Sequence, residues 1–451
     1  MVNPAMFREY DIRGISETDL NDSAVEQLGK GIGTYMRRAG KRNISLGRDC
    51  RLSSERLRNA LSRGLNATGV DVTDIGECPT PVTYFSLHHL NLEGAVMITG
   101  SHNPPNYNGF KICVGHAAIY GDQIQAVRHI IERGDFISGQ GQLTSYDILT
   151  PYKEYLISHF KLRRPIRMVV DAGNGMAGNV APAVFKALGC QVTELFCTLD
   201  GTFPNHHPDP TVVANMQETI KKVLEIKAEV GIAYDGDADR IGVVDDKGNI
   251  IWGDRLLILY ARAVLQRLPG APIISEVKAS KTLYDDIAKH GGRPIMWKTG
   301  HSLIKAKMKE EYSPLAGEMS GHMFFADRYF GYDDAIYASC RLLEILDNSP
   351  QKLSDLLNDV PKTVVTPEIR VDCPEEKKFK LVARLQDYFK TNKFNVVDID
   401  GVRVLFDDGW GLVRASNTGP VLVLRFEGPT EARVQEIRNL IEGKLREFQS
   451  S

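Results

Sequence analysis

Apolar and polar positions recur along the chain with helical and strand periods, which predicts a regular succession of helices and strands. In the first part, residues three or four positions apart predict two amphipathic helices, with buried faces at Val25, Leu28, Ile32 and Tyr35, then at Leu57, Ala60, Leu61 and Leu65. Ser23 and Glu26 form a capping box that predicts the start of the first helix. Apolar runs at 44–46, 70–73 and 95–99 predict strands, with a loop and then a helix expected after the third. Such an alternation predicts an α/β domain with a mixed or largely parallel sheet.

The alternation resumes after a polar, glycine-rich stretch at 134–145, which we interpret as a connection to a second domain. That domain is expected to open with a helix at 151–160 and a strand at 168–171. A third domain is expected from about residue 250, with a helix at 255–268, strands at 272–277 and 294–298, and helices after His301, at 333–346 and at 352–358.

A short internal repeat links these three regions. Ala67-x-Gly69-x-x-Val72-Thr73-Asp74-Ile75 has a counterpart in Ala187-x-Gly189-x-x-Val192-Thr193-Glu194-Leu195, and a looser copy runs from Ala288 through Gly291 and Gly292 to Ile295. The first two copies fall where a predicted helix passes into a predicted strand. We interpret the repeat as the mark of three related α/β domains in tandem.

The last segment has a different pattern. A helix at 375–390, strands at 395–399, 402–406, 411–416 and 421–427, and a final helix at 431–448 predict one sheet flanked by two helices, which is an α+β arrangement. We therefore expect three similar mixed α/β domains, at residues 1–147, 148–249 and 250–361, and a C-terminal α+β domain at 362–451. The segment Pro361–Pro367 is the expected hinge before the last domain.

The bulk composition narrows the class of protein. The 451 residues are 43% apolar and 25% charged, as in a water-soluble globular protein, and the net charge of −2 favours neither nucleic acid nor an anionic membrane as a partner. The seven cysteines include no C-x-x-C pair, which predicts reduced thiols and no zinc site. The N-terminus lacks the apolar core of a signal peptide, and no run is long enough to span a bilayer. We expect a cytoplasmic globular protein.

The first chemical motif is Thr99-Gly100-Ser101-His102-Asn103-Pro104, directly after a predicted buried strand. Asn-Pro and a second proline force a turn there, so Ser101 is expected on a stiff loop at a strand end, where a nucleophile can be presented. An ordinary polar turn is the alternative interpretation of the same residues.

The second motif is Asp235-Gly236-Asp237-Ala238-Asp239-Arg240, after the apolar run that ends at Tyr234. Carboxylates at every second position, separated by small residues, can converge on one point, and hard oxygen ligands suit Mg²⁺ or Ca²⁺ rather than zinc. A solvated acidic turn is the alternative, but three like charges in one loop are unfavourable without a cation.

Two further polar loops lie in the later parts of the chain. Gly317-Glu-Met-Ser-Gly-His322 offers donors and acceptors suited to sugar hydroxyls, although a plain hairpin gives the same pattern. Arg414-Ala-Ser416-Asn417-Thr418-Gly419 lies between two predicted strands and can form a phosphate-binding loop or a capped β-turn.

A fifth motif points to a different class of enzyme. Gly173-Asn-Gly175-Met-Ala-Gly178 follows a predicted strand, matches the dinucleotide-binding pattern G-x-G-x-x-G, and has an acidic residue, Glu194, about twenty positions later. An NAD-dependent oxidoreductase is therefore a rival hypothesis. Glu194 belongs to the internal repeat, however, and the pattern accounts for none of the other four loops.

In the order of these four motifs, Thr99–Pro104, Asp235–Arg240, Gly317–His322 and Arg414–Gly419, the sequence resembles the α-D-phosphohexomutase superfamily over essentially its whole length. Within it, the resemblance is greatest to the bacterial phosphomannomutase/phosphoglucomutase group. The resemblance implies three similar mixed α/β domains and a C-terminal domain like the TATA-binding protein, arranged around a central cleft. The internal repeat agrees with that architecture independently.

The resemblance also implies residue roles. Ser101 matches the phosphoserine, and with Asp235, Asp237 and Asp239 it would bind one Mg²⁺ ion. The residues implied in catalysis are Ser101, His102, Lys111, Arg13, Arg240 and His322. The residues implied in substrate binding are Tyr10, Lys278, His301, Glu318, Ser320, Arg414, Ser416, Asn417 and Thr418. Among His322, His102 and Lys111, the sequence does not select the group that takes the proton of the attacking hydroxyl.

The implied reaction interconverts hexose 1-phosphate and hexose 6-phosphate, with mannose or glucose as the sugar, through a hexose 1,6-bisphosphate that also serves as activator. Mg²⁺ and the cationic side chains would neutralise charge during phosphoryl transfer. Phosphoglucosamine mutase is the nearest alternative, although those enzymes usually carry Gln where Met319 stands. A Mg²⁺-dependent phosphatase and a non-catalytic sugar-phosphate-binding protein are more distant ones. The expected partners are phosphosugars, without nucleic acid or membrane, and we expect a monomer.

Overall fold

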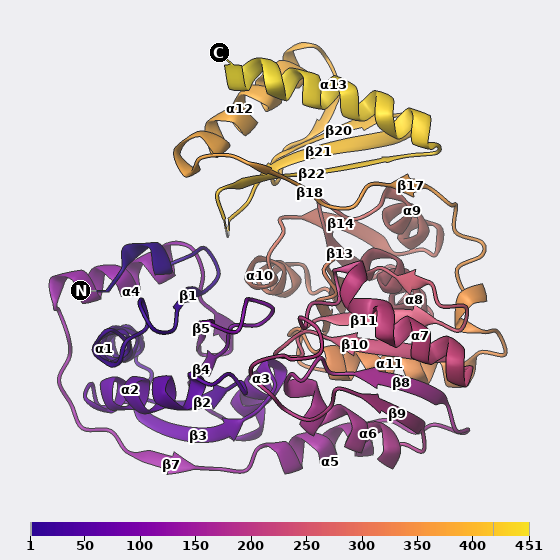
Figure 1. Ribbon diagram of the computed structural model, residues 1–451. Coiled ribbons are helices and arrows are strands. Elements are labelled where there is room, and N and C mark those ends of the chain that lie inside the picture. Colours follow the sequence, from indigo (N-terminus) through magenta and orange to yellow (C-terminus); the bar gives the residue numbers. More distant parts are fainter. Residues whose placement is uncertain (1, 418, 451) are drawn as a thin grey trace.

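The computed structural model describes residues 2–417 and 419–450 of the chain. Four sheets follow one another along the sequence, three of them mixed and the last antiparallel (Figure 1). The first sheet lies at the left of Figure 1, the second and third at the right, and the fourth above them beneath its two helices. The predicted class, three tandem α/β domains and a C-terminal α+β domain, is confirmed.

The first sheet has the strand order β1-β5-β4-β2-β3-β7, with β6 beside β5. Its strands are β1 (Ile12–Ile15), β2 (Asn43–Arg48), β3 (Asp71–Glu77), β4 (Gly94–Ile98), β5 (Tyr107–Val114), β6 (Ala117–Ala118) and β7 (Leu143–Ser145). The helices around it are η1 (Pro4–Met6), α1 (Asp22–Arg38), α2 (Ser54–Asn66), α3 (Thr80–His89) and α4 (Asp122–Arg133).

The second sheet has the order β12-β11-β10-β8-β9 and the third the order β14-β13-β15-β16. The second domain contains α5 (Leu149–His159), β8 (Arg167–Asp171), η2 (Met176–Asn179), α6 (Ala181–Ala187), β9 (Gln191–Leu195), η3 (Val213–Met216), α7 (Gln217–Ile226), β10 (Val230–Tyr234), β11 (Ile241–Asp245) and β12 (Ile250–Ile251). The third contains α8 (Gly253–Leu265), β13 (Pro272–Glu276), α9 (Lys281–Lys289), β14 (Arg293–Trp297), α10 (His301–Glu311), β15 (Leu315–Gly317), β16 (Met323–Phe325), α11 (Ala335–Asn348) and η4 (Leu353–Asp355).

The fourth sheet has the order β17-β22-β21-β20-β19, with β18 also paired to β22, and α12 and α13 pack against it. Its elements are β17 (Val364–Val365), β18 (Ile369–Asp372), α12 (Glu375–Thr391), β19 (Asn395–Val397), β20 (Val402–Phe406), β21 (Gly409–Ala415), β22 (Val421–Gly428) and α13 (Glu431–Ser450).

Strands β4, β10 and β15 occupy equivalent positions in the first three sheets. Each pairs in parallel with one neighbour, which is β2, β8 or β13, and antiparallel with the strand that follows it in sequence, which is β5, β11 or β16. The loops that leave these strands contain Ser101, the three aspartates and Glu318. Three of the four chemical motifs therefore occupy one topological position, repeated in three domains.

The internal repeat also has a common geometry. Gly69, Gly189 and Gly291 each have a left-handed backbone, with φ of +78°, +90° and +77°. Each lies where a helix (α2, α6 or α9) passes into a parallel strand (β3, β9 or β14). Glycine is favoured at such a helix end because it has no Cβ to clash in that conformation.

Several local expectations were wrong. The cap of α1 is Asn21, whose side chain accepts from the Ala24 amide, so Ser23 lies inside the first turn. Strand β5 was not expected; it is buried over most of its length and shows no alternation of polar residues. The expected connection at 134–145 contains β7, which extends the first sheet. The expected helix at 352–358 is only the turn η4, because so short a segment seldom sustains a helix.

The hydrophobic core divides the molecule unequally. One continuous cluster of buried side chains joins α3 of the first domain to the second and third domains. The fourth domain has a separate core between its sheet and its two helices. A small apolar contact that contains Val277 and Trp410 links the third and fourth domains. No helix in residues 2–417 and 419–450 is long and apolar enough to cross a lipid bilayer.

Candidate active site

Ser101 lies at the first turn after β4, where the chain crosses to β5. Its backbone is left-handed, with φ of +49°, and the residue is only 2% exposed. Its hydroxyl donates to Asp235 Oδ2 at 2.9 Å and lies 3.0 Å from His102 Nδ1. A non-glycine residue in this conformation is unusual and is kept only where its surroundings enforce it. The serine is therefore held in a fixed conformation against the acidic loop of the second domain.

The three aspartates of that loop converge as the sequence predicted. Asp235, Asp237 and Asp239 have no exposed surface, and one carboxylate oxygen of each lies within 4.8 Å of the others. Burial and the neighbouring carboxylates raise the pKa of Asp235 well above its ordinary value. Asp237 Oδ1 and Asp239 Oδ1 are buried without a hydrogen-bond partner in the described structure. A divalent cation among these oxygens would satisfy them, so the residues fit a metal site.

Lys111 compensates part of this negative charge. It projects from β5, and its ammonium group lies 2.8 Å from Asp237 Oδ2 and 2.5 Å from Asp239 Oδ2. Thr80, at the start of α3, also donates to Asp237. Although burial opposes ionisation, Lys111 holds the pKa of Asp237 below its ordinary value, and the two carboxylates raise the pKa of Lys111.

The loop from Glu318 to His322 joins β15 to β16, so the hairpin interpretation is confirmed, while its role as a sugar-binding loop stays a prediction. Glu318 accepts from the Gly300 amide at 2.6 Å, and Ser320 lies beside it, 3.3 Å away. Backbone pairing of Arg240 with His322 connects this loop to the acidic loop. The second and third domains therefore meet at their chemical motifs.

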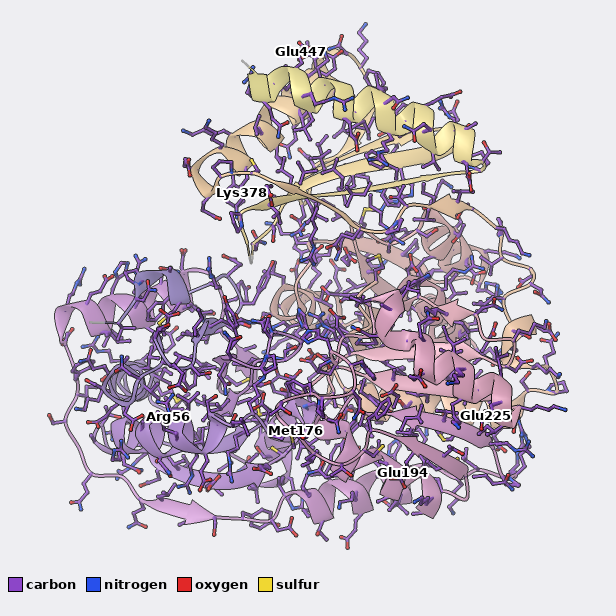
Figure 2. All side chains as sticks on the ribbon, in the orientation of Figure 1. Arg56, Met176, Glu194, Glu225, Lys378 and Glu447 are labelled. Atoms are coloured by element: carbon purple, nitrogen blue, oxygen red, sulfur yellow. The ribbon has the colours of Figure 1, made fainter. Side chains whose placement is uncertain are left out.

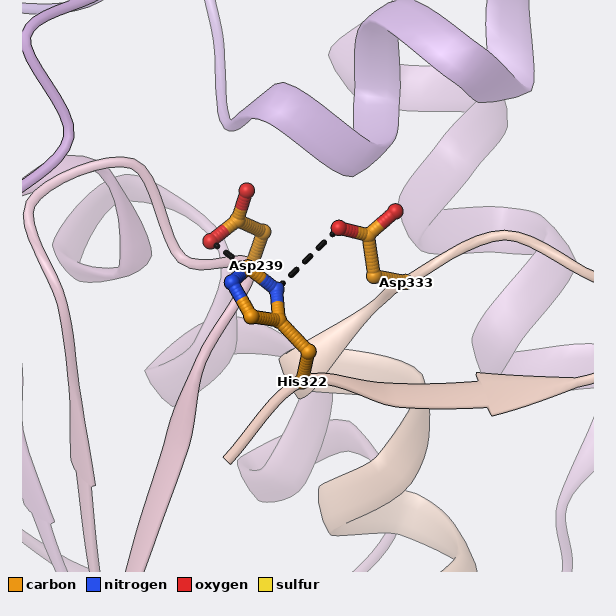
Figure 3. Close-up of side chains that lie close together, drawn as sticks. All are labelled: Asp239, His322 and Asp333. Carbon is orange, nitrogen blue, oxygen red and sulfur yellow. Dashed lines mark ion pairs between the residues drawn. The ribbon is translucent and has the colours of Figure 1, made fainter. Parts of the chain in front are cut away.

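His322 lies between the carboxylates of Asp239 and Asp333 (Figure 3), and Arg240 adjoins its other ring nitrogen. Its Nδ1 is 3.1 Å from Asp333 Oδ2 and 3.5 Å from Asp239 Oδ1, and Arg240 Nε donates to its Nε2 at 3.0 Å. With Nε2 as the acceptor, the ring proton resides on Nδ1, facing Asp333. Lys305 lies 2.9 Å from the other oxygen of Asp333. Asp333 could not be predicted from the sequence, because no local motif surrounds it.

Of the remaining histidines of the site, His301 is buried and His102 is half-buried. His301 begins α10 and stacks on His322, with ring centroids 5.8 Å apart, and Tyr10 meets its edge at 6.2 Å. Burial and Lys305 lower the pKa of His301 well below its ordinary value. Burial, Arg240 and Arg13 lower the pKa of His102 in the same way.

Tyr10 connects three domains through one hydroxyl group. Its oxygen donates to the carbonyl of Thr299 at 2.7 Å and lies 2.6 Å from Asn417 Nδ2, which donates to it. Arg13, on β1, forms an ion pair with Asp11 at 2.7 Å and donates to Asn103 Oδ1 at 3.2 Å, so it faces the Ser101 loop.

The loop between β21 and β22 belongs to the fourth domain. Arg414 lies at the end of β21 and bonds to Asp400 at 3.0 Å, and Ser416 is buried just beyond it. Lys378 of α12, labelled in Figure 2, is buried and donates to the carbonyls of Ser416, at 2.5 Å, and Gly419, at 3.0 Å. The expected site residue Thr418 lies outside the described residues.

Lys278 and Glu276 organise the side of the site near the fourth domain. Lys278 lies 3.2 Å from Glu368, and this partner lowers the pKa of Glu368 to about 2. Glu276 has no exposed surface and accepts from the Lys278 amide at 2.8 Å and from Thr299 Oγ1 at 2.9 Å. Glu276 and Glu368 were not predicted, because their partners are distant in sequence or have no recognisable spacing.

The glycines of the dinucleotide-like motif have another role. A Cβ on Gly175 would lie 2.7 Å from the carbonyl oxygen of Gly236 in the acidic loop, and one on Gly178 would lie 2.2 Å from that of Cys197. Close packing of protein backbone therefore accounts for these glycines.

All seven cysteines are free thiols.

Comparison with family models gives four matches in order along the chain. Residues 4–138, 150–248 and 252–364 match α/β/α domains I, II and III of phosphoglucomutase/phosphomannomutase, and residues 368–444 match the C-terminal domain. These ranges follow the order of the four sheets.

Individual relatives agree over nearly the full length. A phosphomannomutase/phosphoglucomutase of Pseudomonas aeruginosa is 46% identical over 447 residues, which are 99% of this chain and 96% of the relative. A phosphoglucomutase of Neisseria meningitidis is 46% identical over 441 residues, which are 96% of this chain and 95% of the relative. The crystal structure of a phosphoglucomutase/phosphomannomutase family protein of Burkholderia thailandensis matches with a TM-score of 0.94 at 46% identity, covering 99% and 98% of the two chains.

Proposed function

Because the chain belongs to the phosphoglucomutase/phosphomannomutase family, the mutases of the α-D-phosphohexomutase superfamily, we propose that it interconverts hexose 1-phosphate and hexose 6-phosphate through a phosphorylated Ser101. The observation that supports this most directly is the 2.9 Å hydrogen bond from the Ser101 hydroxyl to Asp235. A phosphate on that oxygen would adjoin the acidic cluster. Mannose and glucose are the proposed sugars, as in the names of the relatives.

In the proposed first step, the phosphoserine P–O bond breaks while a hydroxyl oxygen of the hexose phosphate forms a new bond to phosphorus. The hydroxyl proton leaves to a base, for which His102 and His322 are the candidates. Lys111, the third residue named from the sequence, has a pKa raised by its two carboxylate partners and is already protonated. The product is a hexose 1,6-bisphosphate and a free Ser101. In the second step Ser101 takes the other phosphoryl group, and the isomeric monophosphate is released.

We propose that the acidic cluster holds one Mg²⁺ ion, with a phosphoserine oxygen as an additional ligand. The ion would supply charge neutralisation at the transferring phosphoryl group. Lys111 and Arg240 adjoin the same carboxylates, and Arg13 faces the Ser101 loop, so all three can stabilise negative charge there.

Substrate binding is proposed for the side chains of the third and fourth domains. Glu318 and Ser320 would read the sugar hydroxyls, and His301 and Tyr10 line the approach to them. Arg414, Ser416, Asn417 and Thr418 would bind the phosphate that does not react, with Lys278 nearby. One such site must accept either end of the sugar phosphate, because the bisphosphate turns over between the two steps.

The proposal also includes the oligomeric state and the cellular location of the protein. Within one chain, residues from all four domains adjoin one another around Ser101 and Tyr10, which supports a monomer as the active species. The free cysteines support a reducing, cytoplasmic location. Light scattering during size-exclusion chromatography tests the first of these points.

The function is tested with mannose, glucose and glucosamine 1-phosphates, each with Mg²⁺ and a trace of hexose 1,6-bisphosphate. We expect conversion of the mannose or glucose ester to the 6-phosphate, and a loss of more than about 1,000-fold in Ser101→Ala. Ser158→Ala, on the exposed face of α5, is the control and should retain full activity. Release of inorganic phosphate would indicate a phosphatase, and turnover of glucosamine 1-phosphate alone would indicate the nearest alternative.

A further inference from the structure

The Ser101 loop presents an unusual row of backbone carbonyls. Between β4 and β5 the chain forms no extended ladder, so its peptide groups need other partners. The carbonyls of residues 101, 102, 103, 104 and 107 all accept hydrogen bonds from side chains outside the loop. Two residues supply all of these bonds, Arg51 from the first domain and His207 from the second.

Arg51 supplies four of the five. It follows β2, and its side chain has no exposed surface. One terminal nitrogen donates to the carbonyls of Ser101 at 2.9 Å and Asn103 at 2.6 Å. The other donates to those of Pro104 at 2.5 Å and Tyr107 at 3.0 Å. Only a planar guanidinium can reach so many acceptors at once, whereas a lysine ammonium has three donors at a single point.

Asp49 orients this guanidinium from behind. Its Oδ2 lies 3.2 Å from Arg51 Nε and also accepts from the Gly100 amide at 3.0 Å. Its Oδ1 accepts from Ser54 Oγ at 2.5 Å. A Cβ on Gly100 would lie 2.5 Å from Arg51 Cζ, so only glycine allows the guanidinium to pack against the residue that precedes Ser101.

The second domain closes the arrangement from the other side. The ring of Phe203 covers the Arg51 guanidinium at 5.1 Å, and His207 Nε2 donates to the carbonyl of His102. The loop that carries both residues is itself anchored, because His206 lies 3.0 Å from Asp171, which also accepts from Thr219 at 2.7 Å.

We propose that Arg51, assisted by His207, is the positioning residue of the nucleophile: the two side chains clamp the carbonyls of residues 101–107 and hold the phosphoserine oxygen in register with the metal loop. This inference rests on the proposed function and extends it. Arg51 touches the backbone of the loop and acts through it. Displacement of a reacting group by about 1 Å can cost on the order of 100-fold in rate, so loss of the clamp acts on kcat.

The test compares Arg51→Lys with the wild-type enzyme in two measurements. In the mutase assay we expect kcat to fall about 10- to 100-fold, with KM for the hexose 1-phosphate within about 2-fold. In hydrogen–deuterium exchange without substrate, we expect the amides of residues 99–103, 106 and 107 to exchange at least about 10-fold faster, with those of the loop between β21 and β22 unchanged. The control is Arg37→Lys, because Arg37 bonds to the carbonyls of Thr68 and Gly69, at the end of α2. It should leave kcat unchanged.

A second variant covers the case in which Arg51→Lys does not fold. His207→Leu removes the bond from the second domain and should lower kcat about 3- to 10-fold with the same local increase in exchange. Wild-type kcat with unchanged exchange in either folded variant would overturn the clamp, as would an increase in KM alone. Absence of isomerisation by the wild-type protein would refute the proposed function instead, while the exchange measurement would still decide whether the clamp exists.

Discussion

The Ser101 loop and the loop between β21 and β22 both present polar groups at the end of a strand, and a buried cation bonds to the carbonyls of each. For Ser101 the cation is Arg51, and a neighbouring domain adds His207 and Phe203. For the other loop the cation is Lys378, which belongs to the same domain. The first loop is therefore held by two of the three domains that share one core, and the second is held within the fourth domain, which has a core of its own.

This difference separates two tasks of a phosphoryl-transfer site. The reacting oxygen must stay aligned with the cationic groups that stabilise the transition state, so it gains from rigidity. The phosphate that does not react must be captured and released, so its binding loop gains from movement. The ion pair of Lys278 with Glu368 and the Tyr10–Asn417 hydrogen bond lie at the boundary between the two regions.

The largest effect is expected from a substitution in the acidic loop, next to the Ser101 loop. Asp237→Asn should reduce kcat by about 100-fold or more, because one carboxylate ligand and its charge are lost. Without added metal the variant should be less thermally stable than the wild-type protein, because Lys111 favours the ionised form of Asp237 in the folded state. Addition of Mg²⁺ to 100 times its Kd should stabilise the wild-type protein by about 2.7 kcal/mol, and the variant by less. Thermal unfolding with EDTA and with Mg²⁺ measures both effects.

Asp246→Asn is the matched control, since Asp246 follows β11 and accepts from the Ser354 amide, away from the acidic loop. It should show the wild-type response to Mg²⁺. An Asp237→Asn enzyme with an unaltered Mg²⁺ titration would contradict the metal assignment.

A smaller effect is expected from loosening the other loop. Lys378→Met removes the bonds to the Ser416 and Gly419 carbonyls and should raise KM for the sugar phosphate about 10-fold, with kcat within about 3-fold. The result would mirror that expected for Arg51→Lys, in which kcat changes and KM does not. Steady-state kinetics with a hexose 1-phosphate measures both constants.

Lys390→Met is the control on the same helix, because Lys390 pairs with Asp398 on the surface of the domain. It should leave both constants unchanged. A fall in kcat without a change in KM for Lys378→Met would mean that the two loops do not divide the tasks as described.

The smallest expected effect is on the pH dependence of stability, which should differ between Asp334 and Glu368. Burial raises the pKa of Asp334, in the three-domain core, to about 6, whereas Lys278 lowers that of Glu368, at the boundary with the fourth domain, to about 2. The protonated form of Asp334 is favoured in the folded state, so its contribution to stability is lost as pH rises from about 4 through 6. The ionised form of Glu368 is favoured, so its contribution is present above about pH 4.5 and lost as pH falls toward 2.

Denaturant unfolding of Asp334→Asn and Glu368→Gln at several pH values measures these contributions. Between pH 4 and pH 7, the free energy of unfolding of Asp334→Asn should rise by about 1–3 kcal/mol relative to that of the wild-type protein. The loss in free energy of unfolding caused by Glu368→Gln should stay constant between pH 5 and pH 7 and become smaller below pH 4.5. Parallel pH profiles for the two variants would contradict the assignment of opposite shifts.

Much of the candidate site could be predicted from short local patterns in the sequence. Ser101 and the acidic loop could be recognised because their chemistry lies within a few consecutive residues after an apolar strand. Their contact across two domains agrees with the expectation that separate motifs meet at one place. The three glycines of the repeat were recognisable for the same reason, since a left-handed helix end depends mainly on local geometry.

The supporting residues could not be recognised in this way. Arg51, His207 and Lys378 bond to loop carbonyls that lie between 38 and 105 positions away in the sequence. An arginine or a lysine that bonds to backbone looks in sequence like any surface cation, because carbonyl acceptors carry no residue signature. Asp333 escaped notice for a related reason, since its partners Lys305 and His322 come from separate elements.

Because β4, β10 and β15 hold the same place in their sheets, the loops that follow them are a single structural position used three times. Duplication of one ancestral α/β unit, followed by fusion, would leave three paralogous copies of that loop facing one another. Each copy could then specialise, one as nucleophile, one as cation ligand and one as sugar reader. A complex active site can thus evolve when structurally equivalent loops acquire different roles within the same fold.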